Sequence, residues 1–128
     1  MTLRIVRLGT ARIRGEGLRI GTVRRPPRGV PKSQNAAQNW YDVWLPELAP
    51  SARVVKLGHA AATERQWAAF AKRYRAEMAA PEKVRLLELF AALSRQSGFS
   101  MGCYCEDETR CHRSVLRTLL KEHGAEVG

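Results

Sequence analysis

The chain has 128 residues, which suits one globular domain, and 45% of them are hydrophobic, which excludes a wholly disordered protein. The formal net charge is +10. No apolar run approaches the roughly 20 residues that a membrane helix needs, and the N-terminus lacks the apolar stretch of a signal peptide. We therefore expect a cytoplasmic protein with no membrane partner.

The positive charge is concentrated in the first 32 residues. This segment holds one acid, Glu16, and nine basic residues: Arg4, Arg7, Arg12, Arg14, Arg19, Arg24, Arg25, Arg28 and Lys32. A basic end on a near-neutral body indicates an anionic partner such as nucleic acid, a nucleotide or a phosphorylated metabolite, unless the charge only serves solubility. No aromatic residue precedes Trp40, which argues against a base-stacking platform built from this segment alone.

Two strands and a stiff loop are predicted in the N-terminal part. Residues 3–8 and 18–24 alternate apolar and polar side chains as strands do. The following segment, 26–33, has three prolines within six residues, which forbids a regular helix or a central strand. We expect this loop to hold basic side chains out at the end of a strand.

The middle of the chain reads as helical. A helix is expected over about 51–57, and Thr63 with Gln66 three residues later forms a capping-box pattern for the next one. That helix carries a stripe at helical spacing, which predicts core packing: Trp67, Phe70, Ala71, Tyr74 and Met78. Pro81 suits the first turn of a further helix that ends at Gly98.

A last strand and helix complete the predicted fold. Residues 99–105 are a short apolar run typical of a strand buried on both faces of a parallel sheet. Asp107 is the expected cap of a final helix that ends at Gly124. We predict a single three-layer α/β domain with a small, mainly parallel sheet flanked by helices. Its parts are the basic strands and loop (1–38), the helical middle (39–97) and the strand–helix unit (98–128).

The connection between that last strand and helix is the predicted site. Ligands of open α/β sheets bind outside the carboxyl ends of strands, and helix N-termini attract anions. Both conditions meet beside Cys103, Cys111, His112 and Arg113. The first three are the candidate catalytic residues, with a hydrogen-bonding role favoured for His112 over that of a general base.

Thiol catalysis is one reading of the cysteines. An intracellular chain with an odd number of cysteines does not indicate a disulfide framework, and a cysteine near a helix N-terminus can act as a nucleophile. However, four residues separate Cys105 from Arg110, where the phosphotyrosine-phosphatase loop has five, and the acids at 106–108 would repel phosphate. A small buried hydrophobe is the favoured reading of Cys103 and Cys105.

Zinc binding is the other reading. Cys103, Cys105, Cys111 and His112 are residue types that zinc accepts, and a C-x-C pair on one strand face can chelate. Against this, Cys111 and His112 are adjacent, and adjacent side chains on a helix diverge. We therefore expect no bound metal, and nothing else in the sequence indicates a cofactor.

Arginines of the proline loop are the second half of the predicted site. Arginine binds phosphate with two parallel hydrogen bonds. If the strand at 18–24 lies beside that at 99–105, Arg24 and Arg28 approach Arg113. The three would then form a pocket for a phosphate, nucleotide or carboxylate.

Four segments in order resemble a known family. They are Arg24 to Lys32, Asp42 to Ser51, Trp67 to Glu77 and Cys103 to Ser114. The chain resembles the bacterial domain-of-unknown-function family 488, in its YeaO-like branch, over roughly 18–125. The resemblance implies a compact α/β fold, a cytoplasmic protein and no particular activity. It adds Asp42 and Asp107 as supporting residues. This chain departs from the family at Val23 or Thr22, where the family usually has Asp, and at Pro26, where the branch usually has Trp.

Three functions remain open from the sequence. The first is an enzyme or binding protein for a small phosphorylated or nucleotide-like anion, held by Arg24, Arg28 and Arg113. The second is a nucleic-acid-binding module that uses the basic N-terminal segment, and the third is a protein-interaction domain whose basic loop docks an acidic partner. Nucleic-acid binding requires an affinity that falls steeply with salt.

Overall fold

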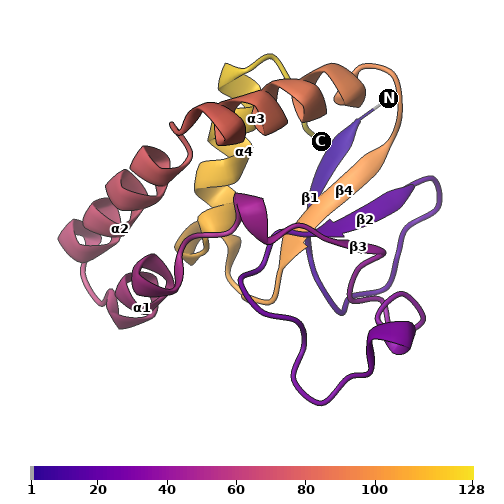
Figure 1. Ribbon diagram of the computed structural model, residues 1–128, viewed down its shortest axis with the longest axis horizontal. Helices are drawn as coiled ribbons and strands as arrows, with labels where there is room; N and C mark the ends of the chain where they lie inside the picture. Colours follow the sequence, from indigo (N-terminus) through magenta and orange to yellow (C-terminus); the bar gives the residue numbers. More distant parts are fainter. Residues whose placement is uncertain (1) are drawn as a thin grey trace.

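Four parallel strands form the sheet of this protein, whose computed structural model describes residues 2–128 (Figure 1). The strands are β1 (Leu3–Arg7), β2 (Leu18–Gly21), β3 (Val43–Trp44) and β4 (Phe99–Cys103). Their order is β1-β4-β2-β3, and all the pairings between them are parallel. The carboxyl ends of the strands therefore share one edge of the sheet.

Strand β4 is the central element, and all five of its residues are buried, as the apolar run predicted. It ends at Cys103, earlier than the expected 105, because the carbonyl of Tyr104 accepts a hydrogen bond from the side chain of Arg7 and not from a neighbouring strand. Strand β2 likewise ends at Gly21, after which Thr22 makes one more backbone bond to Gly102 before the chain enters the proline loop.

The connection from β1 to β2 passes very close to the start of β4. Gly17 has a φ of +77°, and a Cβ added there would lie 2.1 Å from the carbonyl oxygen of Gly98. Only glycine accepts both the left-handed backbone and this contact. The approach fixes where β2 begins beside β4.

The helices are α1 (Ala52–Ala60), α2 (Glu64–Glu77), α3 (Pro81–Ser94) and α4 (His112–Glu122), with short 3-10 turns η1 (Lys32–Gln34), η2 (Pro46–Leu48) and η3 (Glu108–Arg110). The capping box of Thr63 and Gln66 is present, and Pro81 opens α3, as predicted. The apolar stripe of α2 contributes Phe70, Tyr74 and Met78 to the main core.

Helix α4 begins later than the sequence indicated. Asp107 caps η3, where its carboxylate accepts hydrogen bonds from the backbone and hydroxyl of Thr109. The residue that precedes α4 is Cys111, with an extended backbone (φ −131°, ψ 151°). The prediction of Asp107 as the cap of the last helix is therefore wrong, since a separate 3-10 turn intervenes.

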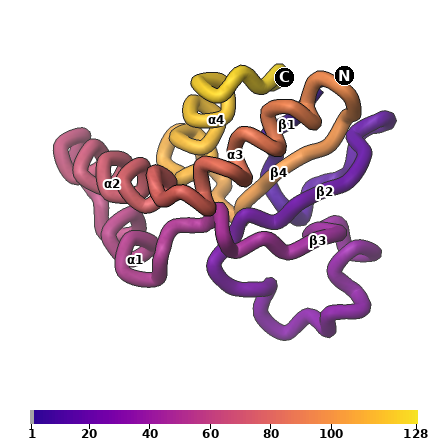
Figure 2. The backbone as a smooth tube through the Cα atoms, turned by 45° about the horizontal axis from the view of Figure 1, so that its top comes forward, coloured from indigo at the N-terminus to yellow at the C-terminus, as the bar shows by residue number. Residues whose placement is uncertain are grey.

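The helices lie together on one side of the view, and the strands lie on the other (Figures 1 and 2). The long loop that contains η1 extends away below β2 and β3. The predicted α/β domain with a small parallel sheet and flanking helices is confirmed. Within residues 2–128, every helix is too short or too polar to cross a membrane.

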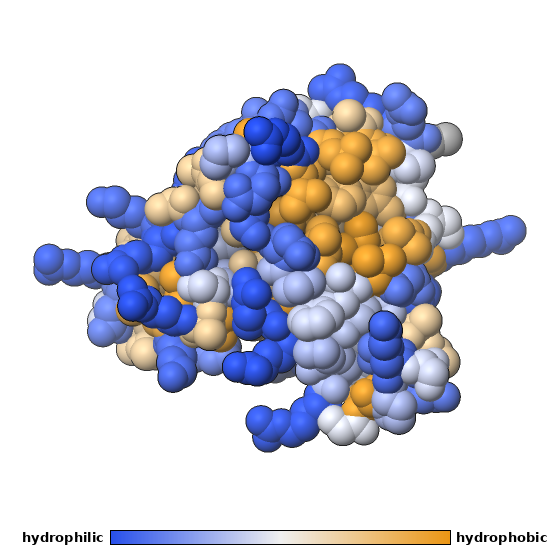
Figure 3. All heavy atoms as spheres, viewed as in Figure 1, coloured by the Kyte–Doolittle hydropathy of each residue, from blue (hydrophilic) through white to orange (hydrophobic). Residues whose placement is uncertain are grey.

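The surface in the same view is mostly hydrophilic, with one apolar patch over α3 and the neighbouring strands (Figure 3). Exposed apolar side chains on these elements are Leu18, Val43, Trp44, Leu89 and Leu93. The three cysteines belong to a second, smaller core at the carboxyl edge of the sheet, which is described next.

Candidate functional site

The candidate site is a cluster of cysteine and histidine side chains at the carboxyl edge of the sheet. Cys103 is the last residue of β4, and Thr22 directly follows β2. Cys111 and His112 stand at the beginning of α4. The predicted strand–helix connection thus comes together with the end of β2, at the edge where open α/β sheets bind ligands.

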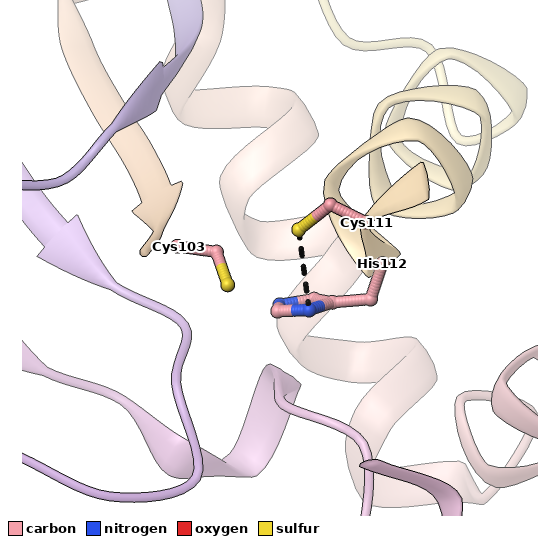
Figure 4. A group of neighbouring side chains, drawn as sticks. All are labelled: Cys103, Cys111 and His112. Carbon is pink, nitrogen blue, oxygen red and sulfur yellow. Dashed lines mark hydrogen bonds between the residues drawn. The ribbon is translucent and has the colours of Figure 1, made fainter. Parts of the chain in front are cut away.

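The sulfur and nitrogen atoms of the cluster lie within contact of one another. The Sγ atoms of Cys103 and Cys105 are 3.8 Å apart, and so are the Sγ of Cys111 and the Nδ1 of His112. The ligand atoms of Cys103, Cys111 and His112 all lie within 4.8 Å of one another. Figure 4 shows these three side chains pointing into one space between the end of β4 and the start of α4.

Cys111 and His112 share this space although they are adjacent in sequence. The expectation that their side chains diverge is wrong, because it assumed that both residues are helical. Cys111 is extended and His112 is the first helical residue. The change of backbone conformation between them turns both side chains to the same side.

A backbone hydrogen bond fixes the imidazole of His112. Its Nε2 lies 2.7 Å from the carbonyl oxygen of Thr22. A carbonyl oxygen only accepts hydrogen bonds, so Nε2 carries a proton and Nδ1 is the ring nitrogen that faces Cys111. The hydroxyl of Thr22 is 3.1 Å from the carbonyl of Gly102 in β4, so it ties the same segment to the central strand.

Hydrogen bonds within the cluster separate the pKa values of the three thiols. Bonds from Cys103 and Cys111, together with the charge of Arg113, lower the pKa of Cys105 far below its ordinary value of 9.0. The pKa of Cys103 is raised, because it donates to Cys105 and Cys111 and is buried. The pKa of Cys111 is lowered, mainly by its hydrogen bond with Cys103. A thiolate is therefore favoured at Cys105 or Cys111 over one at Cys103.

Arg113 is buried directly beside the cluster, with 3% of its surface exposed. Its Nη2 donates to the backbone carbonyl of Cys105 at 2.6 Å. Its Nε is buried and has no hydrogen-bond partner among the described residues. A buried donor without a partner costs about 1–3 kcal/mol, which a ligand that accepts this hydrogen bond would recover.

The proline loop reaches the site, as its sequence position required. The hydroxyl of Tyr104 donates to the backbone carbonyl of Arg25 at 2.9 Å. Val23, at the start of the loop, packs in the small core with Cys103 and Cys111. This part of the predicted geometry, with loop and cysteine strand side by side, is present.

The loop arginines do not all contribute to the site. Arg24 donates from Nε and Nη2 to three backbone carbonyls around η2, those of Pro46, Ala49 and Pro50. Its guanidinium therefore holds the start of α1 and is not free to bind an anion, which removes it from the expected pocket. Arg28 is exposed, so it remains available.

The two supporting acids have structural partners. Asp42 accepts two hydrogen bonds from Arg12, at 2.8 and 3.0 Å, and one from the backbone of Arg19. It thereby docks the β1–β2 connection against the segment before β3. Asp107 serves η3, where the hydrogen bonds from Thr109 lower its pKa.

Three residues of the site were not among the catalytic or anion-binding candidates of the sequence. Cys105 was considered as a zinc ligand but was set aside as a small hydrophobe, although the C-x-C alternation with Cys103 placed both on one face. Thr22 contributes its backbone carbonyl, which binds the imidazole of His112, and Tyr104 contributes its hydroxyl, which donates to the carbonyl of Arg25. No local pattern indicates either contact, because each joins segments about 80–90 residues apart.

Fold and site together define a small parallel α/β domain with a cysteine–histidine–arginine cluster at the carboxyl edge of its sheet. The family described as the active DUF488-N3 subclade matches residues 3–124. The chain therefore belongs to the DUF488 family, as its motifs predicted, and its place in the YeaO-like branch stays a prediction. No curated protein and no solved structure matches the chain.

Proposed function

We propose that this protein is a cytoplasmic enzyme that binds a small phosphorylated or nucleotide-like anion at the carboxyl ends of β2 and β4. The observation that carries the proposal is Arg113, a buried guanidinium whose Nε finds no hydrogen-bond partner in the described part of the chain. It lies in the first turn of α4, where the helix N-terminus also favours negative charge. An anion accepting the Nε–H bond would satisfy the one buried side-chain donor that has no partner within residues 2–128.

Two further features support this site. Exposed basic residues of the proline loop, Arg25 and Arg28, stand on the segment that Tyr104 ties to the cluster. They raise the local concentration of anions by attraction over several ångströms. The matching subclade is described as active, which supports an enzymatic role over a purely structural one.

The reactive groups nearest Arg113 are the sulfurs and the imidazole. Cys105 is the most exposed of the three cysteines, and its carbonyl is held by Arg113. Cys103, Cys111 and His112 are buried behind it. An anion at Arg113 would therefore meet Cys105 first, with the other groups next to it.

Nucleic-acid binding has weaker support than it had from the sequence. Of the nine basic residues near the N-terminus, Arg12, Arg19 and Arg24 are paired with a carboxylate or with backbone carbonyls. Fewer of these guanidinium groups are therefore free to contact the phosphates of a nucleic acid. A shallow dependence of nucleic-acid affinity on salt would agree with this.

The proposal is tested by thermal shift with inorganic phosphate and nucleoside monophosphates. A ligand at a hundred times its Kd stabilises the fold by about 2.7 kcal/mol. Arg113→Lys keeps the charge and removes Nε, so it should lose most of this gain, while Arg73→Lys on the exposed side of α2 should keep it. Equal stabilisation of Arg113→Lys and the wild type, or no stabilisation by any of these anions, would overturn the proposal.

A further inference from the structure

We infer that Cys103, Cys105, Cys111 and His112 form a binding site for one thiophilic metal ion of the Zn²⁺ class. The inference rests on the proposed function only for the use of the site, since it assigns the reactive groups beside Arg113 to a metal. The metal site itself follows from the arrangement of Cys103, Cys111 and His112, with the Sγ of Cys105 in contact with that of Cys103. Thiolate and imidazole are the ligands that zinc prefers in proteins.

The two short contacts match the edges of a zinc tetrahedron. With Zn–S near 2.3 Å, two sulfurs of a tetrahedral site are about 3.8 Å apart, and a sulfur and a nitrogen about 3.6 Å apart. The Sγ atoms of Cys103 and Cys105 are separated by 3.8 Å, as are the Sγ of Cys111 and the Nδ1 of His112. The remaining pairs among Cys103, Cys111 and His112 lie within 4.8 Å, so an ion would draw them together by at most about 1 Å.

The imidazole is already prepared as a ligand. Metal-bound histidines usually donate their second N–H to a carbonyl or carboxylate, which fixes the tautomer and the ring orientation. In His112 the Nε2–H donates to the carbonyl of Thr22 at 2.7 Å, and Nδ1 faces the sulfurs. A histidine that only filled space in the core would not need its Nδ1 to face the sulfur atoms.

The surroundings suit a small charged complex. Leu8, Val23 and Tyr41 pack around Cys103 and Cys111 and keep bulk water away. Each thiol releases its proton to solvent as its Zn–S bond forms. Three thiolates with Zn²⁺ carry one net negative charge, and the guanidinium of Arg113, whose Nη2 lies 2.6 Å from the carbonyl oxygen of Cys105, offsets it.

A bound ion would brace the proposed anion site. It would join the end of β4 to the first residue of α4 and so close the turn between 103 and 112, which contains η3. Arg113 donates to the backbone carbonyl of Cys105, whose thiolate is one of the four proposed ligands. The position of the guanidinium thus depends on the metal, and phosphate should bind more weakly after the metal is removed.

The test uses the full chain, reduced and freed of metal by a chelator. We expect one equivalent of Zn²⁺ per chain, and with Co²⁺ the sulfur-to-cobalt charge-transfer band and the intense visible bands of a tetrahedral site. His112→Gln removes Nδ1 but retains an N–H for Thr22, and it should weaken Zn²⁺ binding on the order of 100-fold or more. His123→Gln, at the exposed end of α4, is the matched control and should bind as the wild type does.

The outcomes separate this inference from the proposed function. Loss of Zn²⁺ in His112→Gln together with its retention in Arg113→Lys supports the metal site, whatever phosphate does. Unchanged Zn²⁺ affinity in both His112→Gln and Cys111→Ser, or no Zn²⁺ uptake by the reduced protein, would overturn it. Conversely, phosphate could stabilise the metal-free protein as strongly as the metal-bound protein while still requiring Arg113. That result would retain the proposed function and refute the claim that the metal positions Arg113 for anion binding.

Discussion

The buried ion pair between Glu16 and Arg19, which contacts Ser100 of β4, leads to the most quantitative prediction from the structure. Arg19 is fully buried, and its Nε and Nη2 bind the two carboxylate oxygens of Glu16 at 2.7 and 3.0 Å. Its Nη1 donates to two backbone carbonyls, and Ser100 of β4 donates to Glu16 at 2.7 Å. Replacing Glu16 with Gln would leave a buried guanidinium without its counter-charge.

The expected cost of Glu16→Gln at pH 7 is about 3–5 kcal/mol, the range for breaking one partner of a buried pair. The pKa of Glu16 gives a second figure for the stabilisation free energy that the ion pair contributes. Burial alone would raise this pKa, but hydrogen bonds from Arg19 and Ser100 lower it from 4.5 to about 2. A difference of this size between folded and unfolded states corresponds to about 3 kcal/mol.

The sign of the pH dependence follows from the lowered pKa. The stabilisation is complete above pH 4.5, the value for the unfolded chain, and is lost as the pH falls toward 2. The measurement is urea unfolding of wild type and Glu16→Gln at pH 7 and at pH 3, with the exposed Glu47→Gln as control. A difference between wild type and Glu16→Gln that is small at pH 7, or that does not shrink at pH 3, would refute the reasoning.

Three further substitutions test separate contacts. Arg24→Ala should destabilise the fold by about 1–3 kcal/mol in urea unfolding, because it loses hydrogen bonds to three carbonyls, and should leave phosphate affinity unchanged. Tyr104→Phe removes the bond to the carbonyl of Arg25, and we expect a loss of about 1 kcal/mol and faster hydrogen exchange in the proline loop. Gly21→Ala places a Cβ 2.4 Å from the ring of Tyr41 and should cost about 1–3 kcal/mol in thermal unfolding. Wild-type stability in any of the three would show that the corresponding contact is absent in solution.

The fold was predictable where local pattern and tertiary environment agree. The apolar run at 99–105 was predicted as a strand buried on both faces, and its first five residues form the fully buried strand β4. The capping box of Thr63 also specified its helix start correctly. Asp107 was assigned to the wrong element, because a capping side chain fits a 3-10 turn as well as the helix that follows it.

The site was predictable in place but not in composition. The carboxyl edge of a parallel sheet and a helix N-terminus can be located from the order of elements. The convergence of Cys111 and His112 depends on one extended residue before α4, which a helical reading of the segment misses. The guanidinium of Arg24 donates to backbone carbonyls that lie more than 20 residues away in the sequence. Composition alone could not show these hydrogen bonds, so it assigned one arginine too many to the anion pocket.

The Nε–H resonance of Arg113 gives the most direct test of the central claim, that an anion accepts a hydrogen bond from this buried donor. In a ¹⁵N spectrum of the full chain, we predict that this resonance shifts as phosphate is added, and that the shift saturates with the same Kd as that found by thermal shift. A resonance that stays fixed while those of the exposed loop arginines move would place the anion elsewhere and contradict the account.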